Sequence, residues 1–368
     1  NSDWSSDVCS SDLAYKILAI NPGSTSTKIA IFEDDQQIFV KTIRHSAEEI
    51  GSFPTIASQF SYRKDIILST LKEAGISLSD IHAIVGRGGL IKPIESGIYE
   101  VNAEMIRDLK VPVMGEHASN LGGLIAQDIA QSLGNRAKAY IADPVVVDEL
   151  QPLARLSGHP LLPRVSIFHA LNQKAIARTY AAEVGKKYED LNLVIAHMGG
   201  GVSVSAHCQG KVVDTNNALD GDGPFSPERS GGLPTGGLVE LCYSGKPKGE
   251  IKKILKGEGG VVAYLGTNDM RMVEEKAASD PRYAQIQEGM CYQIAKEIGS
   301  MAAVLKGKVD AILLTGGIAY GKPITDYITD MVHFIAPVKI YPGEDEMRAL
   351  ALNGLMVLKG QLQPKIYK

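Results

Sequence analysis

The chain has 368 residues, 44% hydrophobic and 22% charged, which is the composition of a globular protein long enough for two domains of ordinary size. Its formal net charge of −4 gives no general attraction to nucleic acid or to anionic membranes, so we expect no nucleic-acid or membrane partner. No apolar run reaches the roughly 18 to 20 residues of a membrane span, and the four scattered cysteines lack zinc-site or disulfide-framework spacing, which favours a reducing cytoplasm.

Residues 1–13, NSDWSSDVCSSDL, differ in character from the rest of the chain. They are rich in serine and aspartate, and they lack the basic and apolar regions of a signal peptide. The segment resembles the translation of a sequencing-adapter fragment. We therefore interpret it as non-native and expect the native chain to begin near Ala14.

From Tyr15 onward, strand-like apolar runs alternate with segments of helical periodicity, which predicts an α/β protein. In the predicted helices, apolar residues recur at steps of three and four residues. The predicted strands include 16–20, 28–32, 83–85 and 193–196, and the clearest predicted helices are 123–133, 170–184 and 283–305.

Two segments far apart in the chain follow the same plan. ILAINPGSTSTKIAIF (17–32) and LVIAHMGGGVSVSAHC (193–208) each run from an apolar strand through a polar residue and a glycine turn into a second strand. This repetition predicts two similar domains facing one cleft. Unrelated short hairpins with glycine turns remain an alternative, because such hairpins are common.

The first of these turns, Asn21 to Lys28, has the composition of a phosphate-binding loop. Glycine lets the backbone approach an anion closely, and backbone amides, hydroxyl groups and a lysine supply hydrogen-bond donors. A solvated Ser/Thr/Gly turn is the alternative. The candidate ligands are Asn21, Gly23, Ser24, Ser26 and Lys28.

Two further glycine turns follow apolar strands, at 197–201 (HMGGG) and 315–318 (TGGI). Consecutive glycines cost backbone entropy and do not help a strand to pack, so we expect a ligand to approach them closely. The segment 316–323, GGIAYGKP, has a proline where a P-loop needs serine or threonine, so we do not interpret it as a P-loop.

Several charged and imidazole side chains could act on a phosphoryl group. Arginines in glycine-rich settings suit bidentate phosphate contacts, histidines can donate to a transferring phosphoryl group, and carboxylates can hold Mg²⁺. Exposed loop arginines, capping or core histidines and a solvated acidic turn are the alternatives. The candidates are Arg87, Arg229, His117, His169, His197, Asp143 and the acidic turn of Glu344, Asp345 and Glu346.

Taken together, these segments resemble the butyrate kinase branch of the acetate kinase family, in the superfamily of sugar kinases, chaperones and actin. The resemblance covers nearly everything after Leu13. It implies an α/β, duplicated ribonuclease H-like (actin-like ATPase) fold, with two domains around a central nucleotide cleft. The motifs that carry it, in chain order, are INPGSTSTK, VGRGG, GEHASN, AYIADPVVVDEL, SIFHALNQKAIAR, HMGGG, PERSGG, LLTGGIA and YPGEDEMRALA.

The same resemblance implies a division of the chain. Residues 14–145 and 346–368 would form an N-terminal carboxylate-side domain to which a C-terminal helix returns. Residues 146–345 would form a C-terminal nucleotide-binding domain.

The resemblance also implies roles for the candidate residues. The first loop, with His197 and Gly199, Gly200 and Gly201, would bind ATP and the transferred phosphate, while Gly316 and Gly317 would lie against the adenosine. The catalytic residues would be Arg229, His169, His117, Arg87 and Asp143; Asp345 and Glu346 would serve Mg²⁺; Val85 and Phe168 would line the acyl pocket.

Two departures from the acetate kinase pattern match the butyrate kinase branch. Arg87 stands where acetate kinases have a histidine, and Gly200 stands where they have an asparagine. Both differences favour an acyl substrate longer than acetate.

The implied reaction is reversible transfer from ATP to butyrate, giving ADP and butyryl phosphate, by direct in-line displacement with Mg²⁺ as cofactor. A carboxylate nucleophile needs no general base. Isobutyrate, propionate and acetate are alternative acceptors, and a homodimer or higher oligomer is the expected assembly. An actin-like or chaperone-like nucleotide switch is less favoured, because only 22 residues follow Glu346, too few for a further substrate-binding domain.

Overall fold

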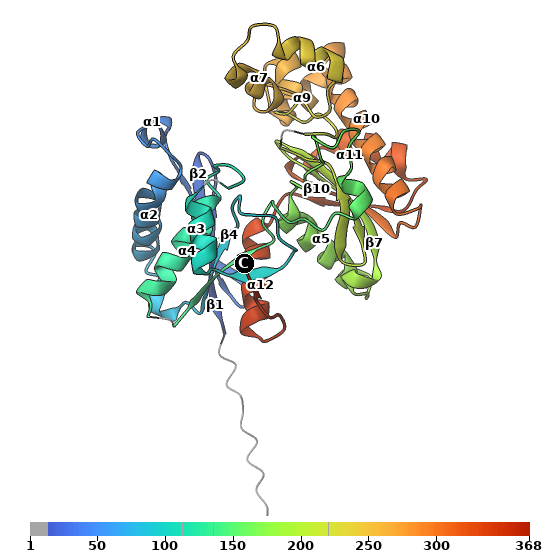
Figure 1. Cartoon of the computed structure of the whole chain (residues 1–368). Coiled ribbons are helices and arrows are strands. Elements are labelled where there is room, and N and C mark those ends of the chain that lie inside the picture. The colour runs from blue at the N-terminus through green and yellow to red at the C-terminus, as the bar shows by residue number, and fades with distance from the viewer. Residues whose placement is uncertain (1–13, 112, 135, 220) are drawn as a thin grey trace, which may run out of the picture. The chain divides into compact units, whose positions relative to one another are not determined.

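A computed structural model describes residues 14–368 with the exception of 112, 135 and 220 (Figure 1). The predicted non-native segment 1–13 lies outside the described residues. The structure divides into two compact units. Among the described residues, unit 1 comprises those up to Gly88 with Ile98–Ala142 and Leu350–Lys368, and unit 2 comprises Gly89–Gly97 and Asp143–Ala349.

Each unit is built on one sheet. The sheet of unit 1 has the order β12-β5-β6-β4-β1-β2-β3, and the sheet of unit 2 has the order β11-β10-β7-β8-β9. The strands are β1 (Lys16–Pro22), β2 (Ser26–Glu33), β3 (Gln36–Arg44), β4 (Ala83–Arg87), β5 (Ile98–Glu100), β6 (Lys138–Ala142), β7 (Asn192–Met198), β8 (Val202–Cys208), β9 (Lys211–Thr215), β10 (Ala311–Gly316), β11 (Val338–Pro342) and β12 (Lys365–Ile366).

The two sheets share one plan. In unit 1, β1, β2 and β3 form an antiparallel meander, and β4 and β6 continue the sheet parallel to β1. In unit 2, β7, β8 and β9 form the same meander, and β10 and β11 continue it parallel to β7. The order β3-β2-β1-β4-β6 is therefore repeated as β9-β8-β7-β10-β11. The predicted α/β class and the predicted duplication are confirmed.

Helices cover both faces of the first sheet. Gly86 and Val85 are neighbours on β4, so their positions face opposite sides of the sheet. A Cβ built on Gly86 would lie 2.3 Å from the Gly122 carbonyl oxygen, so α4 packs closely on one face of the sheet. A Cβ built on Gly354 would lie 2.8 Å from Val85 Cγ2, so α12 packs closely on the other face. The helices of this unit are α1 (Ala47–Gly51), α2 (Phe60–Glu73), α3 (Ala103–Lys110), α4 (Asn120–Ser132) and α12 (Glu346–Leu358), whose residues from Leu350 onward belong to it.

The second sheet is also covered on both faces. Along β7, Val194 packs in a hydrophobic cluster with Ile294 of α10, whereas Leu193 and Ile195 pack with Ala177 of α5. The helices of unit 2 are α5 (Ala170–Glu183), α6 (Thr235–Cys242), α7 (Lys248–Leu255), α8 (Val261–Leu265), α9 (Met270–Ala277), α10 (Pro281–Val304) and α11 (Lys322–Val332).

Short 3-10 helices complete the described secondary structure: η1 (Ala57–Gln59), η2 (Leu78–Asp80), η3 (Pro152–Arg155), η4 (Tyr188–Asp190) and η5 (Gly317–Tyr320). The three helices predicted most clearly are present as α4, α5 and α10, although α4 begins at Asn120 rather than at Gly123. Within the described part of the chain, no helix is long and apolar enough to cross a membrane.

Candidate active site

The predicted phosphate loop of unit 1 is the turn between β1 and β2, and a buried arginine lies beneath it. Arg63 of α2 is fully buried, and its guanidinium group donates to the carbonyl oxygens of Gly23 at 2.8 Å, Ser26 at 3.1 Å and Ser24 at 3.2 Å. Because these carbonyl oxygens are held by a buried cation, the loop can offer its amide and hydroxyl donors to an anion.

Arg63 is absent from the predicted site residues, although the sequence carries a signal for it. On α2, Arg63, Ile67 and Leu71 are buried at steps of four residues, so the arginine occupies the apolar face of the helix. Burial lowers the pKa of Arg63, but a guanidinium group remains charged at neutral pH. A buried charge of this kind needs several acceptors, and the loop provides them.

Two other predicted residues of unit 1 meet at the carboxyl ends of parallel strands. Asn21 lies near the end of β1, and Arg87 is the last residue of β4. Arg87 Nη1 donates to Asn21 Oδ1 at 3.3 Å. Lys28 is the cross-strand partner of Asn21. The structure therefore brings Asn21, Lys28 and Arg87 together at one end of the strands β1, β2 and β4.

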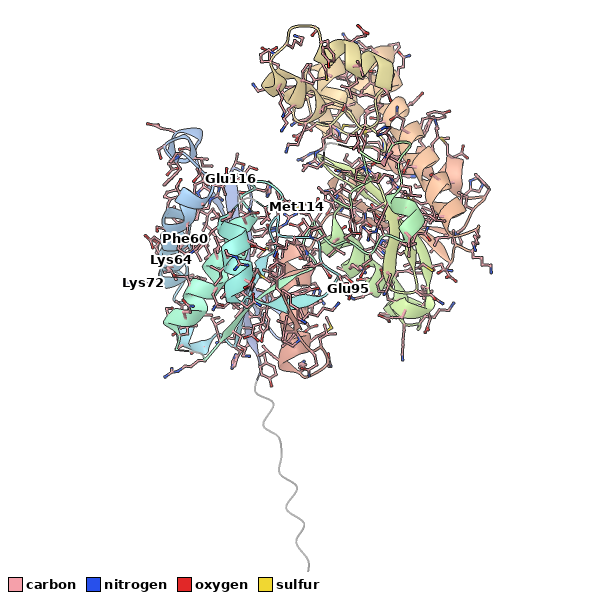
Figure 2. The ribbon with its side chains drawn as sticks, in the orientation of Figure 1. Phe60, Lys64, Lys72, Glu95, Met114 and Glu116 are labelled. Atoms are coloured by element: carbon pink, nitrogen blue, oxygen red, sulfur yellow. The ribbon has the colours of Figure 1, made fainter. Side chains whose placement is uncertain are left out.

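His117 lies in the turn that leads into α4, the helix whose first turn packs on Arg87. The Asn120 amide donates to the His117 carbonyl oxygen at 2.9 Å, and a Cβ on Gly122 would lie 2.4 Å from the Arg87 carbonyl oxygen. The His117 side chain is exposed, and the Ser119 amide donates to its Nδ1 at 3.1 Å. The neighbouring Glu116 accepts from the amide of Ile56, which ties this turn to the segment before α2 (Figure 2).

In unit 2, three turns meet at the carboxyl ends of β7, β10 and β11. Thr315 pairs with His197, and Gly316 forms a bridge with Gly343. Gly316 has φ of +93°, and a Cβ built on it would lie 2.3 Å from the Met198 carbonyl oxygen. Glycine is therefore required at Gly316 by both conformation and space.

The glycine turn 199–201 lies directly against Arg229. Ser226 Oγ donates to the Gly200 carbonyl oxygen at 2.7 Å, and a Cβ built on Gly201 would lie 1.9 Å from Arg229 Nη1. The guanidinium group of Arg229 also donates to the carbonyl oxygen of Ala218. The predicted phosphate turn and the predicted catalytic arginine are thus in contact.

Two histidines stack beside this turn. The rings of His169 and His197 have centroids 3.8 Å apart and an interplanar angle of 10°. His197 is fully buried, its Nδ1 lies 2.8 Å from Asn172 Oδ1, and its Nε2 lies 3.2 Å from Glu344 Oε1 without hydrogen-bond geometry. The acidic turn is therefore adjacent to His197.

The predicted metal ligands, Asp143 and the acidic turn, offer carboxylate oxygens to a cation. Asp143 has φ of +38°; its Oδ1 accepts from the Gly97 amide at 2.7 Å, and its buried Oδ2 makes no hydrogen bond and lies 3.6 Å from Arg178 Nη1. A buried carboxylate oxygen of this kind suits a cation or its bound water. Asp345 Oδ1 accepts from the Arg348 amide at 3.1 Å, and Glu346 lies in the first turn of α12.

Among the described residues, no group of three or more histidine, cysteine, aspartate or glutamate side chains could hold a metal ion. Mg²⁺ often takes only one or two carboxylates together with substrate phosphates and water. The oxygens of Asp143 and of the acidic turn therefore fit this ion as ligands that act together with a nucleotide.

Comparison with known proteins decides the family. Residues 161–332 match the Acetokinase family. Butyrate kinase 1 of Clostridium acetobutylicum is 59% identical over 356 residues, covering 96% of this chain and 100% of that protein. A probable butyrate kinase of Clostridium botulinum (strain Eklund 17B / Type B) is 54% identical over 357 residues, with the same coverage. The chain belongs to the acetokinase family.

Solved structures confirm the fold expected of an acetokinase. Porphyromonas gingivalis acetate kinase superposes with a TM-score of 0.77 at 19% identity, covering 94% of this chain and 100% of that one. A propionate kinase from Francisella tularensis subsp. tularensis SCHU S4 gives 0.72 at 18% identity, with 92% and 98% covered. The resemblance stated from the motifs is confirmed, and as a family member the chain is a kinase that takes ATP as a substrate.

This acetokinase has a cavity of about 550 Å³ beside Gly317, a size typical of small-molecule sites. Of the residues that line the cavity, only Gly317 was predicted from the sequence. The residues of α9 carry no motif, and they line the cavity together with residues of η5 and α11. The side chains that line it with the glycines are Met270, Arg271, Glu274, Ile318, Tyr320 and Ile324.

The two residues predicted to line the acyl pocket lie in hydrophobic cores. Val85 is fully buried in unit 1 against α12. Phe168 is 2% exposed in unit 2 and packs with Val147, Ala170 and Val212. Their role in acyl binding stays a prediction.

Proposed function

We propose that this acetokinase is a butyrate kinase, which reversibly transfers the γ-phosphoryl group of ATP to butyrate to give ADP and butyryl phosphate. The observation that carries the proposal is the 59% identity to Butyrate kinase 1 over the whole length of that protein. The loops of both units have the composition that phosphoryl transfer requires, since catalysis of this kind depends on positioning and charge.

We propose that unit 2 binds the nucleotide. The amides of Gly200 and Gly201 and the side chain of His197 contact the phosphates, while Gly199, whose own amide donates to the Gly201 carbonyl oxygen at 2.9 Å, lets the turn approach them closely. The adenosine occupies the cavity beside Gly316 and Gly317. Arg229 and His169 lie against the same turn and stabilise the phosphoryl group during transfer. The predicted boundaries are residues 146–345 for the nucleotide-binding domain and residues 14–145 and 346–368 for the carboxylate-side domain. They differ from the two units in that Gly89–Gly97, residues 143–145 and residues 346–349 belong to unit 2.

Unit 1 then supplies groups for the acceptor and the transferred phosphate. Asn21, Ser24, Ser26 and Lys28 offer donors from the loop above Arg63, and Gly23, whose amide donates to the Ser26 carbonyl oxygen at 2.7 Å, closes the turn and lets an anion approach. Arg87 and His117 add a cation and an imidazole at the same end of the strands. A carboxylate oxygen of butyrate attacks the γ-phosphorus, the bond to the bridging oxygen breaks, and its electron pair leaves with ADP. Butyrate is already ionised at neutral pH, so no protein base is needed.

Mg²⁺ is the cofactor that we assign to this reaction, because it neutralises β- and γ-phosphate oxygens when it is bound. Asp143, Asp345 and Glu346 are the side chains that would hold it, directly or through water. Oδ2 of Asp143 supports this assignment, because it is buried and makes no hydrogen bond, its partner being Arg178 Nη1 in an ion pair at 3.6 Å.

The acyl chain would contact apolar side chains, for which Val85 and Phe168 are the candidates. One methylene is worth only about 1 to 3 kcal/mol in a hydrophobic pocket. Isobutyrate, propionate and acetate are therefore expected to react more slowly than butyrate and not to be excluded.

We further propose a homodimer or higher homo-oligomer in the cytoplasm, where ATP is available and free thiols such as Cys208, Cys242 and Cys291 persist. Four leucines support self-association, because each is at least 69% exposed, all four lie within the ten residues 153–162, and exposed apolar side chains gathered in one region are typical of an interface. They are Leu153, Leu156, Leu161 and Leu162.

The test is acyl phosphate formation. Purified protein is incubated with Mg-ATP and acetate, propionate, butyrate, isobutyrate or valerate, and the acyl phosphate is trapped with hydroxylamine. We expect hydroxamate with butyrate at the highest kcat/KM. An absence of hydroxamate with every acid would overturn the proposal.

A further inference from the structure

We propose that a directed series of hydrogen bonds, buried except at its last link, holds the proton of the neutral His169 ring on Nε2, and that Ser203 and Gln173 are positioning residues for this purpose. The inference deepens the proposed function, on which the role of His169 rests. The series runs through Tyr188, His207, Gln173, Ser203 and His169.

The direction of the series is set at Gln173. Its side-chain amide nitrogen lies 3.2 Å from the Ser203 carbonyl oxygen and 2.8 Å from Ser203 Oγ. A backbone carbonyl oxygen can only accept, so the group facing it is the NH₂ group. Gln173 Oε1 therefore points the other way, to His207 Nε2 at 2.9 Å, and accepts a proton from it.

The hydroxyl group of Ser203 transmits this direction to His169. Its oxygen accepts from the Gln173 amide group and, at 3.4 Å, from the backbone amide of His169. With both lone pairs engaged, its single proton is directed to His169 Nδ1 at 2.9 Å. Since Nδ1 accepts, the neutral His169 ring carries its proton on Nε2, from which it can donate to a phosphoryl oxygen.

The hydrogen bonds at the Tyr188 end of this series run in the same direction. Burial lowers the pKa of His207 well below its ordinary value, and the charge of Lys174 lowers it further, so this ring is neutral. Because His207 Nε2 donates to Gln173, its Nδ1 must accept, and the Tyr188 hydroxyl donates to it at 2.7 Å. Burial also raises the pKa of Tyr188 well above its ordinary value, which keeps this donor protonated.

His117 of unit 1 offers an independent parallel. The backbone amide of Ser119 can only donate, and it lies 3.1 Å from His117 Nδ1. The neutral His117 ring therefore also carries its proton on Nε2. Both histidines proposed to act on the phosphoryl group therefore have the same tautomer. The tautomer of His169 is set by a series of side-chain hydrogen bonds, and that of His117 by a backbone amide.

The tautomer can be read directly by long-range ¹H–¹⁵N correlation spectra of histidine-labelled protein, with the His169 signals assigned by a His169→Gln variant among the eight histidines. We expect Nε2 protonated and Nδ1 unprotonated in the wild type at a pH where the ring is neutral. Protonation on Nδ1 would overturn the proposal. This measurement needs no substrate, so its failure is distinct from a failure of the proposed function.

Kinetics of Ser203→Ala test the consequence. We expect kcat to fall by about tenfold or more while KM for ATP changes little, because ring orientation and tautomer act on the transferring group rather than on nucleotide binding. Ser203→Thr retains the hydroxyl and should restore most of kcat. Ser205→Ala is the matched control, since Ser205 is equally buried on the same face of β8 but bonds Thr215 at 2.7 Å.

Full activity in Ser203→Ala, or an equal loss in Ser205→Ala, would contradict the proposal. If Ser203→Ala does not fold, Gln173→Met provides a second test at similar side-chain size. It removes the donor that faces Ser203 Oγ, which leaves a lone pair of the hydroxyl oxygen open to a proton on His169 Nδ1, so the ring proton should shift toward Nδ1. An unchanged His169 spectrum in folded Gln173→Met protein would also overturn the proposal.

Discussion

Arg229 packs against Gly201, and the absence of a side chain at this glycine makes room for the guanidinium group. A Cβ at Gly201 would lie 1.9 Å from Nη1 and 2.6 Å from Cζ of Arg229. The end of an arginine side chain can move, whereas the strands on either side of the turn cannot. A methyl group at Gly201 should therefore displace Arg229 without unfolding the protein.

We predict that Gly201→Ala lowers kcat by about a hundredfold to a thousandfold, the range found when one stabilising donor is lost from an active site. Steady-state kinetics with butyrate would measure it. The control is a double-mutant cycle with Arg229→Ala. If Gly201→Ala acts through Arg229, it should cost little in the Arg229→Ala background; a full and additive loss there would refute this mechanism.

At the scale of the element, helix α2 places the buried guanidinium group of Arg63 beneath the loop between β1 and β2. Arg63 stands on the same buried face as Ile67 and Leu71, where a hydrophobic residue would be expected. Lys64, the next residue, forms a half-exposed ion pair with Asp128 at 3.0 Å and lies along the same helix (Figure 2). The helix therefore offers a structural cation and a surface cation side by side.

We predict that Arg63→Met lowers the free energy of unfolding by about 2 to 5 kcal/mol, because it leaves several loop carbonyl oxygens without their donor. Urea unfolding would measure this loss. Lys64→Met is the matched control, for which exposure limits the loss to about 1 kcal/mol or less. Equal losses in the two variants would show that the loop does not depend on Arg63.

Elements built on local periodicity could be predicted, and contacts between distant elements could not. The hairpins at 17–32 and 193–208 and the helices α5 and α10 follow from apolar spacing and glycine turns. The two-residue strand β12 and the three-residue strand β5 are too short to carry a pattern of their own. Their pairing depends on tertiary context.

The same limit applies to the site. Glycine turns, and the arginines within them, can be recognised in the sequence. Glycine loses much conformational entropy on folding, so consecutive glycines indicate a position where a close approach or an unusual backbone conformation is needed. Ser203 and Gln173 are 30 residues apart, and the fold joins them by a hydrogen bond between α5 and β8. Val85 was predicted to line the acyl pocket and lies in a hydrophobic core. An apolar residue near a functional turn cannot be distinguished from a core residue by sequence alone.

At the scale of the whole molecule, the exposed leucines of residues 153–162 make self-association testable. We predict that the wild type is at least dimeric and that Leu161→Glu with Leu162→Glu shifts it toward monomer, because charges oppose burial of this surface. Light scattering after size-exclusion chromatography would measure the mass. Phe334→Ser, at another exposed apolar site of unit 2, is the control.

An unchanged mass in the double leucine variant would show that another surface forms the oligomer. A monomeric wild type would contradict self-association itself.

The duplicated fold is shared by enzymes with different acceptors, so the acceptor must be shown by chemistry rather than by architecture. The most direct measurement is a ³¹P NMR time course of Mg-ATP, butyrate and the purified protein. We predict butyryl phosphate and ADP in equal amounts, with regeneration of ATP when the two products are supplied instead. Release of inorganic phosphate from ATP at a rate independent of butyrate, without butyryl phosphate, would contradict the proposed function.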